Sequence, residues 1–324
     1  MKKIAVVGVT GVVGRVFLEE IEKQNLLGNE FVFYASKKSA GRKVCLGGKK
    51  FKIQALDEEI LSQNFDYAVF CTRETVSKDF VPKLAKNGCK VIDFSSYYRK
   101  KNPLIVPEIN ADKAKGNILC NPNCSTIAGV MALYEIYKKF GLKRIVYSTY
   151  QAVSGAGKDA LDDYHKKRVK NLKSFKFPIF NNLIPYIGDI AKNGYSKEEN
   201  KMIYETHKIL GDFKINVTAT CVRVPVDICH SESINFETEK KCTAKQIVNV
   251  LKNTKGVQVL DEFPNFPMPK IVRGSEKVFV GRIRKDLSHE NSFNIFVVSD
   301  NLRKGAAQNG AQILKLLMER DESL

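Results

Sequence analysis

The sequence predicts an α/β protein in which a doubly wound parallel sheet of the Rossmann type is followed by an α+β part with a mixed sheet. Over the first 120 residues, short apolar runs alternate with segments of helical period, which is typical of βαβ units. After about residue 125, longer segments alternate polar and apolar residues with a period of two, which favours an antiparallel or mixed sheet. A chain of 324 residues has room for two domains.

Each expected element follows from its local pattern. In the first part, apolar runs predict strands at residues 4–8, 31–35, 66–71, 91–94 and 118–120. Helical periods in the same part predict helices at 13–24 and 76–87. In the second part, alternation predicts strands at 145–153, 215–226, 231–237 and 292–299, and a tail helix is expected over 305–320.

The net charge of +18 makes nucleic acid a partner to consider. However, the lysines are scattered as doublets such as Lys37-Lys38 and Lys100-Lys101, and no helix-turn-helix pattern occurs. The densest basic stretch, residues 166–176, lacks the interleaved aromatic residues of a single-strand binder. We therefore expect a positive field that attracts small anionic ligands, with no nucleic-acid partner.

The spacing of the cysteines and the lengths of the apolar runs indicate the cellular compartment of the protein. The eight cysteines form no Cys-x-x-Cys pair, and the four histidines do not stand at metal-ligand spacing from cysteine pairs, so no metal is predicted. No run of about 18 apolar residues occurs, so no segment is expected in a membrane. The apolar start is interpreted as a strand because glycines interrupt it. Free thiols then favour a cytoplasmic protein.

A glycine-rich turn follows the first expected strand and opens the first helix. Its residues are Gly8, Val9, Thr10, Gly11, Val12, Val13 and Gly14. Glycines there allow backbone N–H groups to approach a pyrophosphate, and the helix start adds a positive dipole end. The spacing is Gly-x-x-Gly-x-x-Gly, a variant of the usual fingerprint. The turn predicts a dinucleotide site, with a structural turn as the alternative.

The end of the second expected strand indicates which dinucleotide binds. NAD binders usually place an acidic residue there to hold the ribose 2′-hydroxyl. Here Tyr34-Ala35 is followed by Ser36, Lys37, Lys38 and Ser39, with hydroxyls and cations but no acid. Such a set suits a 2′-phosphate, so NADP(H) is favoured over a plain basic surface loop.

Cys124 falls at the expected start of a helix, after Asn121-Pro122-Asn123. Unpaired N–H groups and the helix dipole stabilise a thiolate at such a position, which lowers the thiol pKa. The same N–H groups are candidates to hold an oxyanion when sulfur attacks a carbonyl. An inert core cysteine is the alternative.

Several motifs in a fixed order resemble the aspartate-semialdehyde dehydrogenase family, and the match covers essentially the whole chain. The segments that carry it are 8–14, 36–41, 93–99, 121–126, 151–157, 223–226 with 230–232, and 279–286. One stretch departs from the family pattern, because bulky Arg73 and Glu74 stand where small residues often lie near the cofactor. They leave the strictness of NADP over NAD open.

The resemblance implies a role for each residue of the catalytic centre. Cys124 is the nucleophile, and His230 is the general acid/base for the thiohemiacetal hydroxyl. Gln151 orients the intermediate, and Asn123 helps to position the carbonyl oxygen. Arg223 clamps the substrate α-carboxylate, which a planar guanidinium does well.

The resemblance also implies further contacts to substrate and cofactor. Arg99 and Lys201 bind phosphate, and Glu198 binds the substrate ammonium, with a surface ion pair between Glu198 and Lys201 as the alternative. Ser196 and Glu199 are expected to form a capping box at the start of their helix. Asn301 contacts the nicotinamide, with Ser154 and Gly155 close to it.

The implied enzyme reduces 4-phospho-aspartate to aspartate semialdehyde with NADPH, in the synthesis of lysine, threonine, methionine and diaminopimelate. Residues 1–125 form the NADP-binding domain, residues 126–300 form the catalytic and dimerisation domain of a homodimer, and the C-terminal helix 301–324 packs back on the first domain. The rivals are glyceraldehyde-3-phosphate dehydrogenase, N-acetyl-glutamyl-phosphate reductase, and a non-catalytic protein that binds dinucleotides or nucleic acid.

Overall fold

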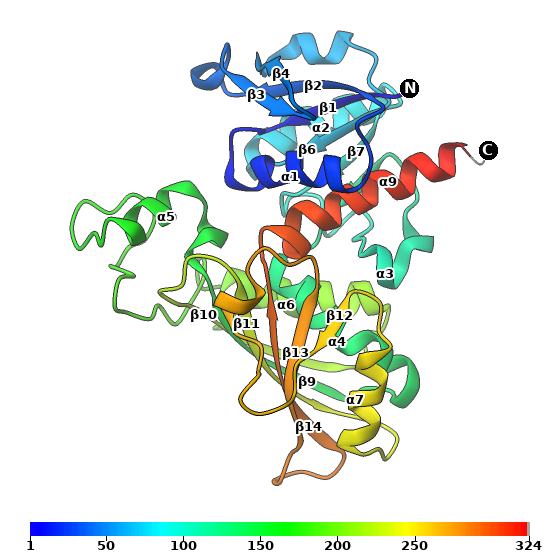
Figure 1. Cartoon of the computed structure of the whole chain (residues 1–324), viewed down its shortest axis with the longest axis vertical. Coiled ribbons are helices and arrows are strands. Elements are labelled where there is room, and N and C mark those ends of the chain that lie inside the picture. Colours follow the sequence, from blue (N-terminus) through cyan, green and yellow to red (C-terminus); the bar gives the residue numbers. More distant parts are fainter. Residues whose placement is uncertain (323–324) are drawn as a thin grey trace. The chain divides into compact units, whose positions relative to one another are not determined.

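The computed structural model describes residues 1–322, which form two compact units. The first unit consists of Met1–Pro122 together with a segment that begins at Ala306, and the second unit is Asn123–Gly305. In Figure 1 the first unit is the blue-to-cyan part plus the red helix α9. Residues 323 and 324, where the predicted tail ends, lie outside the described residues.

The first unit contains a parallel sheet of six strands in the order β5-β2-β1-β6-β7-β8. Its strands are β1 (Lys3–Val7), β2 (Glu30–Ala35), β5 (Gln54–Ala55), β6 (Tyr67–Phe70), β7 (Lys90–Asp93) and β8 (Ile118–Cys120). The strand order reverses direction between β1 and β6, which is where a doubly wound sheet binds its ligand. The Rossmann-type prediction is confirmed.

Both faces of this sheet are buried, which explains the continuous apolar runs of its strands. Ile4 and Val6 of β1 pack on the side of α1 (Val12–Lys23) and α9 (Gln308–Glu322). Ala5 and Val7 pack on the opposite side, beneath α2 (Glu74–Lys86). The predicted tail helix is present as α9, and a π-helical turn at Arg303–Ala307 precedes it.

Three strands of the first unit were not predicted. One is the two-residue strand β5, and the other two are β3 (Lys43–Leu46) and β4 (Lys49–Lys52), which form an antiparallel hairpin. The turn consists of Gly47 and Gly48, whose φ values of +55° and +74° suit a tight hairpin loop. Four lysines on these two strands hide the alternation of apolar residues, so the segment looks like a polar loop in the sequence.

The second unit contains a mixed sheet of six strands in the order β10-β9-β11-β14-β13-β12, as the fold prediction required. The edge pairs β10–β9 and β12–β13 are parallel, and the three central pairs are antiparallel. The strands are β9 (Arg144–Gln151), β10 (Asn216–Arg223), β11 (His230–Glu237), β12 (Val257–Val259), β13 (Val278–Lys285) and β14 (Ser292–Ser299).

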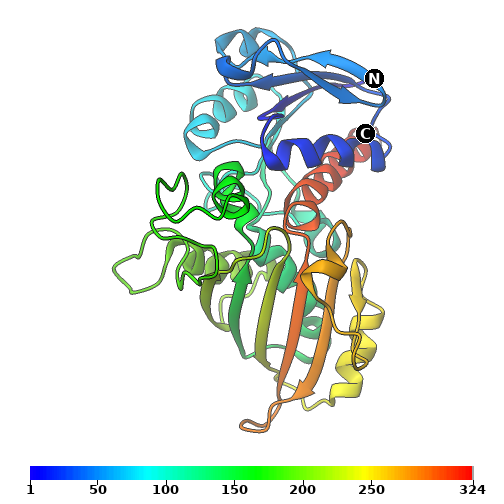
Figure 2. The same cartoon turned by 60° about the vertical axis from the view of Figure 1, so that its left-hand side comes forward.

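Helices cover one face of the mixed sheet. They are α6 (Lys197–Leu210) over β10, α4 (Cys124–Phe140) over the centre, and α7 (Ala244–Lys252) over β12 and β13. Figure 2 looks onto the opposite face, where the short α8 (Pro269–Val272) lies over the end of β14. Much of this second face is open within the described chain, and it is a candidate for contact with another molecule.

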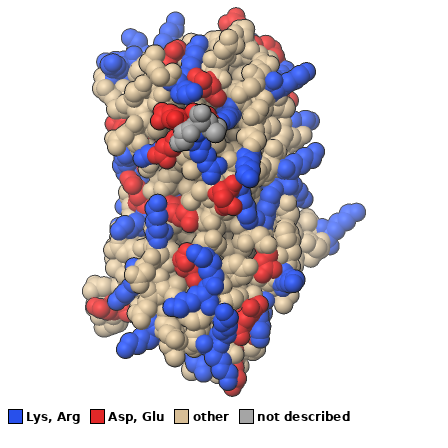
Figure 3. Space-filling view, turned by 90° about the vertical axis from the view of Figure 1, so that its right-hand side faces the viewer, with Lys and Arg blue, Asp and Glu red and all other residues tan. Residues whose placement is uncertain are grey.

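The remaining helices are α3 (Pro107–Asn110) in the first unit and α5 (Lys158–His165) in the second. Within residues 1–322, every helix falls short of the length and apolar character that a bilayer crossing requires. Figure 3 shows lysines and arginines spread over one face of the molecule, with acidic groups among them.

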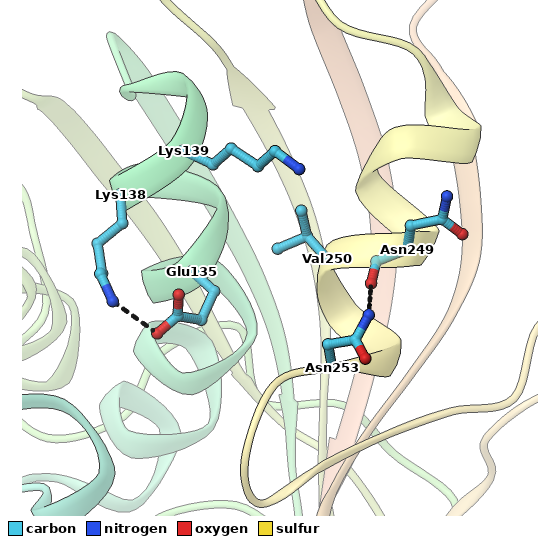
Figure 4. Close-up of a pocket in the computed structure, with 6 residues that line it drawn as sticks. All are labelled: Glu135, Lys138, Lys139, Asn249, Val250 and Asn253. Carbon is cyan, nitrogen blue, oxygen red and sulfur yellow. Dashed lines mark hydrogen bonds and ion pairs between the residues drawn. The ribbon is translucent and has the colours of Figure 1, made fainter.

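A shallow hollow of about 440 Å³ separates the end of α4 from α7 (Figure 4). The Nζ of Lys138 lies 3.1 Å from an oxygen of Glu135, and the Asn253 amide donates to the Asn249 carbonyl. These side chains are mostly exposed and already bonded to neighbours on their own helices. The hollow is therefore a solvated groove between two helices.

Candidate active site

The topology of the mixed sheet brings three predicted site residues to one edge. Gln151 ends β9 and Arg223 ends β10, and these two strands run parallel. His230 begins β11, which runs antiparallel to β9. The end of a strand and the start of its antiparallel neighbour meet at the same edge of a sheet, so the three side chains gather there.

Cys124 is the first residue of α4, as predicted, and it is half-buried. The residue before it, Asn123, is the N-cap, and its side-chain oxygen accepts from the N–H groups of Ser125 and Thr126 at 3.0 and 3.2 Å. This cap occupies two N–H groups that the sequence made candidates for an oxyanion site, so an oxyanion requires other donors.

Glu198 connects the nucleophile helix to α6. Its Oε1 accepts from the side-chain amides of Asn123 at 2.8 Å and Gln151 at 3.1 Å, and its Oε2 lies 3.2 Å from Lys201 Nζ. Burial alone would raise the pKa of Glu198, but Lys201, the two amides and Arg223 together lower it to about 2. Glu198 is therefore an ionised carboxylate.

The expected capping box holds Glu198 in this place. Ser196 N donates to Glu199 Oε2 at 2.6 Å, and Glu199 N donates to Ser196 Oγ at 3.3 Å. Glu198, at the second position of α6, is only 7% exposed. A solvated surface ion pair, the alternative from the sequence, does not describe so buried a carboxylate.

Ala152, directly after Gln151, fixes both His230 and Arg223 through its backbone. Its carbonyl accepts from Arg223 Nη1 at 2.6 Å, and its N–H donates to His230 Nδ1 at 3.0 Å. Burial, with Arg223 nearby, lowers the pKa of His230 to about 3 against the opposing effect of Glu198. The ring is therefore neutral, and because Nδ1 accepts a hydrogen bond, the proton is on Nε2.

Gly155 lies against the same two side chains. A Cβ at Gly155 would be 3.0 Å from Arg223 Nη1 and 3.2 Å from His230 Nε2. Asn301 donates to Ser154 Oγ at 3.0 Å and accepts from the N–H of Cys229 at 2.9 Å. Ser154, Gly155 and Asn301 are thus assembled beside His230 within the second unit.

Burial lowers the pKa of the Arg223 guanidinium, while Glu198 and Cys124 act in the opposite direction. Arg223 is 4% exposed, and its Nε has no hydrogen-bond partner among residues 1–322. A buried donor without an acceptor lowers the stability of the folded protein, unless a bound ligand accepts the hydrogen bond. A buried cation close to the thiol is suited to bind the carboxylate of a small substrate.

The predicted dinucleotide turn lies in the first unit, directly after β1. Gly8 has a φ of +89°, and its N–H donates to the Tyr34 carbonyl at 2.8 Å. A Cβ at Gly14 would be 2.3 Å from the Gly8 carbonyl oxygen, so only glycine fits. The N-cap of α1 is Gly11, which has no side chain to claim the first-turn N–H groups. The turn therefore fits a pyrophosphate.

The residues after β2 form a short 3₁₀ turn at Lys37–Ser39, with Ser36 and Lys38 exposed. The two bulky residues that depart from the family pattern lie at the start of α2, after β6. Arg73 is the exposed N-cap of α2, and Glu74 accepts a hydrogen bond from Ser96.

Arg99 also belongs to the first unit, in the loop after β7. It is 8% exposed, and its Nη2 donates to the Phe94 carbonyl at 2.9 Å. The predicted residues thus fall into two groups. The second unit brings together Cys124, Asn123, Gln151, Arg223, His230, Glu198, Lys201, Ser154, Gly155 and Asn301, and the first unit holds the glycine turn, the 36–39 segment and Arg99.

Three residues that shape the site were not predicted from the sequence. Ala152 acts through backbone atoms, which leave no signal in a side-chain pattern. Gly305 passes close to the nucleophile, since a Cβ there would be 3.0 Å from Cys124 Cβ. Glu205 accepts from the Asn123 N–H at 2.6 Å. Its spacing of seven residues from Glu198, which places both on one helix face, was the signal that could have found it.

Comparison with protein families and solved structures agrees with this architecture. Residues 3–117 match the family model "Semialdehyde dehydrogenase, NAD binding domain", and residues 133–304 match "Semialdehyde dehydrogenase, dimerisation domain". The fold and the site therefore define a two-domain semialdehyde dehydrogenase with a nicotinamide cofactor.

Individual relatives narrow the class. The chain is 46% identical to the aspartate-semialdehyde dehydrogenase of Aquifex aeolicus over 98% of each chain. It superimposes on aspartate semialdehyde dehydrogenase II from Vibrio cholerae, solved in complex with ASA, with a TM-score of 0.94, 38% identity and 98% coverage of each chain. A Candida albicans structure with NADP has a TM-score of 0.77 at 26% identity, again over 98% of both chains.

The chain belongs to the aspartate-semialdehyde dehydrogenase family, and it is an enzyme of that activity.

Proposed function

We propose that this enzyme catalyses the reversible, NADPH-dependent reductive dephosphorylation of 4-phospho-L-aspartate to L-aspartate 4-semialdehyde through a thioester on Cys124. The observation that carries the proposal is the buried Arg223 guanidinium, which interacts with the helix-terminal Cys124 thiol and shares the Ala152 backbone with the buried His230 imidazole. The product would supply the synthesis of lysine, threonine and methionine, and of diaminopimelate in bacteria.

The substrate has three charged groups, and we assign each to a residue of opposite charge. Arg223 clamps the α-carboxylate, and its unpaired Nε supports this role. Glu198, whose pKa of about 2 keeps it ionised, holds the α-ammonium. Lys201 and Arg99 bind the phosphate. The relative from Vibrio cholerae was solved in complex with ASA, which supports a small-molecule substrate for this chain.

The chemistry begins at the sulfur. The Cys124 thiolate attacks the acyl carbon, a carbon–sulfur bond forms, and phosphate leaves with the electron pair of the broken carbon–oxygen bond. NADPH, when bound, supplies the hydride that reduces the thioester. Collapse of the thiohemiacetal on Cys124 then releases the aldehyde and regenerates the thiolate. Gln151 and Asn123 keep the acyl oxygen oriented during these steps.

His230 handles the oxygen of the intermediate. Its proton is on Nε2, which has no hydrogen-bond partner among residues 1–322. We therefore propose that Nε2–H donates to the developing oxyanion, in place of the N–H groups that the Asn123 cap occupies. Removal of the hydroxyl proton in the reverse direction requires the other tautomer, with the Ala152 bond broken.

We propose NADP(H) as the preferred cofactor. Gly8, Thr10, Gly11, Val12, Val13 and Gly14 would hold the pyrophosphate, and Ser36, Lys38 and Ser39 would hold the 2′-phosphate. Exposed hydroxyl and ammonium groups after β2, with no carboxylate among residues 36–42, support this choice. Ser154, Gly155 and Asn301 would contact the nicotinamide.

The test is the Cys124→Ala variant of the full chain. We expect complete loss of turnover, with NADPH binding retained in a fluorescence titration, because only the nucleophile is removed. Turnover at the wild-type rate would overturn the thioester mechanism. Comparing NADPH formation from aspartate semialdehyde plus phosphate with that from glyceraldehyde-3-phosphate or the N-acetyl-glutamyl aldehyde tests the substrate, since preference for a rival would contradict the assignment.

We further propose a homodimer joined through the second unit, residues 123–305, with the first unit as the NADP-binding domain. The matching family model for residues 133–304 is described as a dimerisation domain, which supports this arrangement. We propose the cytoplasm as the compartment, because a reducing environment keeps Cys124 as the free thiol that the mechanism needs.

A further inference from the structure

The start of the nucleophile helix is held by two carboxylates that come from one face of α6. Glu198 Oε1 accepts from the Asn123 side-chain amide at 2.8 Å, and Glu205 Oε2 accepts from the Asn123 backbone N–H at 2.6 Å. Glu205 is 1% exposed and lies seven residues after Glu198, or about two helical turns. Of the two, only Glu198 has a role in the mechanism above.

The Glu205 contact fixes the backbone that carries the sulfur. Asn123 has the extended φ and ψ of −61° and 143° that an N-cap needs, and Cys124 follows it immediately. With its N–H held by Glu205 and its side chain held by Glu198, Asn123 cannot rotate without breaking a buried hydrogen bond. A reacting atom must stay within about 0.5 Å of its productive position, so this constraint matters for turnover.

Glu205 also brings charge to the helix start. Its carboxylate is bonded to the residue adjacent to Cys124, in a buried setting where charges are weakly screened. A nearby negative charge opposes ionisation of a thiol. Other charged or titratable groups near the start of α4 include Arg223 on β10, His230 and Glu232 on β11, Glu198, Lys201 and Glu199 on α6, and the buried Lys304 next to Gly305.

We propose that Glu205 is a positioning residue for the nucleophile, whose carboxylate fixes the start of α4 through the Asn123 N–H and whose charge restrains ionisation of the Cys124 thiol. This inference rests on the proposed role of Cys124. The opposing interpretation is that Glu205 is only a hydrogen-bond acceptor between two helices. The Glu205→Gln variant distinguishes the two interpretations. Its amide oxygen can still accept the hydrogen bond from the Asn123 N–H, but the negative charge is removed.

The first experiment measures alkylation of Cys124 by iodoacetamide as a function of pH in Glu205→Gln, with the modified peptide quantified by mass spectrometry. We expect Cys124 to react about three- to tenfold faster than in the wild type near pH 7, because loss of a close negative charge favours the thiolate. Cys45, which is exposed in the first unit, is the internal reference and should keep its profile.

The matched control is Glu199→Gln. Glu199 is a buried carboxylate of the same helix, but it accepts from Ser196 and Cys221 and not from Asn123. We expect the alkylation rate of Cys124 to change by less than about twofold in this variant, because Glu199 is not bonded to the residue beside Cys124 and glutamine can keep the capping box with Ser196. An unchanged profile in Glu205→Gln, or an equal shift in both variants, would overturn the charge restraint.

The second experiment tests positioning with Glu205→Leu, which removes the acceptor but keeps the volume. We expect kcat to fall by about tenfold or more with the KM for NADPH unchanged, because the sulfur is misplaced while the cofactor unit is untouched. Glu205→Gln should restore most of kcat. Wild-type kcat in the leucine variant would overturn positioning, whereas activity in Cys124→Ala would instead contradict the mechanism on which this inference rests.

Discussion

Arg223 is anchored by one short hydrogen bond from Nη1 to the Ala152 carbonyl, and its Nε is buried without a partner in the described chain. We therefore predict that Arg223→Lys lowers kcat/KM for aspartate semialdehyde by about a hundredfold, because lysine keeps the charge but loses the planar fork that binds a carboxylate at two points. The KM for NADP should not change.

Steady-state kinetics at saturating phosphate would measure this effect. The control is Arg273→Lys, at an arginine that is exposed and paired with Asp227 at 2.8 Å. It should keep kcat/KM within about twofold, as surface ion pairs contribute little. If Arg223→Lys behaved like this control, Arg223 would not be the carboxylate clamp.

Glu232 follows His230 by two residues, on the same face of β11. It is completely buried, and neither carboxylate oxygen has a hydrogen-bond partner among residues 1–322. Burial raises the pKa of Glu232 well above its ordinary value. The folded protein therefore holds a proton here that the unfolded chain releases above about pH 4.3. The associated stability is fully present below that pH and is lost as the pH rises toward the folded pKa.

We predict that Glu232→Gln unfolds at higher urea concentration than the wild type at pH 8, because glutamine is neutral and carries no such pH penalty. The difference in free energy of unfolding should be about 1–3 kcal/mol and should shrink toward pH 5. Urea titrations at both pH values measure it. Equal stability of the two proteins at pH 8 would show that Glu232 is satisfied by another group.

At the scale of elements, the turn that opens α1 depends on one glycine more than on its neighbour. A Cβ at Gly14 would be 2.3 Å from the Gly8 carbonyl oxygen, whereas a Cβ at Gly11 would be 3.3 Å from the same atom. We predict that Gly14→Ala lowers the free energy of unfolding by about 2 kcal/mol or more, since backbone must shift. Gly11→Ala should cost less, about 1 kcal/mol, because alanine is a poorer N-cap than glycine but the backbone has to shift less.

Thermal unfolding of both variants, followed by circular dichroism, measures this difference. The two variants are matched controls for each other, because both glycines lie at the start of α1 and both substitutions add one methyl group. Similar melting temperatures for the two variants would mean that the close packing of α1 against the Gly8 turn is not what requires glycine at position 14.

The elements with local signals were predictable from the sequence. The helix starting at Cys124 and the capping box at Ser196 have short, specific patterns, and the structure contains both. The β3–β4 hairpin was missed because lysines cover its apolar alternation. The two hydrogen bonds made by the Ala152 backbone could not be predicted. They depend on how β9 aligns with β10, which carries Arg223, and with β11, which carries His230, and an alanine in the sequence does not indicate that alignment.

For the whole molecule, residue patterns predicted a parallel sheet followed by a mixed one, but not the strand order of the second sheet. That order joins β11 to β14 across some sixty residues, and β12 pairs with β13 through a parallel contact of only three residues. Such pairings join strands that are far apart in sequence, and several strands of similar composition could pair in their place, so the sequence pattern does not determine the order. The clustering of Cys124, Gln151, Arg223 and His230 followed from motif resemblance rather than from any sequence pattern of the sheet itself.

The open face of the mixed sheet carries the last prediction, which concerns assembly. Along β9, Ile145, Tyr147 and Thr149 are buried beneath the helices, while Tyr150 points to the other face and is 41% exposed. Its ring lies 6.4 Å from that of Phe296 on β14. Aromatic side chains gathered on an uncovered sheet face are typical of the centre of a protein interface.

We predict that Tyr150→Asp converts the proposed homodimer to a monomer, because a charge buried at the centre of an interface without a partner costs several kcal/mol. Size-exclusion chromatography with light scattering measures the mass directly. Leu27→Asp, at a 47% exposed leucine of the first unit, is the control and should leave the mass unchanged. A dimer that persists in Tyr150→Asp at micromolar concentration would place the contact elsewhere, since an interface of ordinary size could not bury that carboxylate and stay closed.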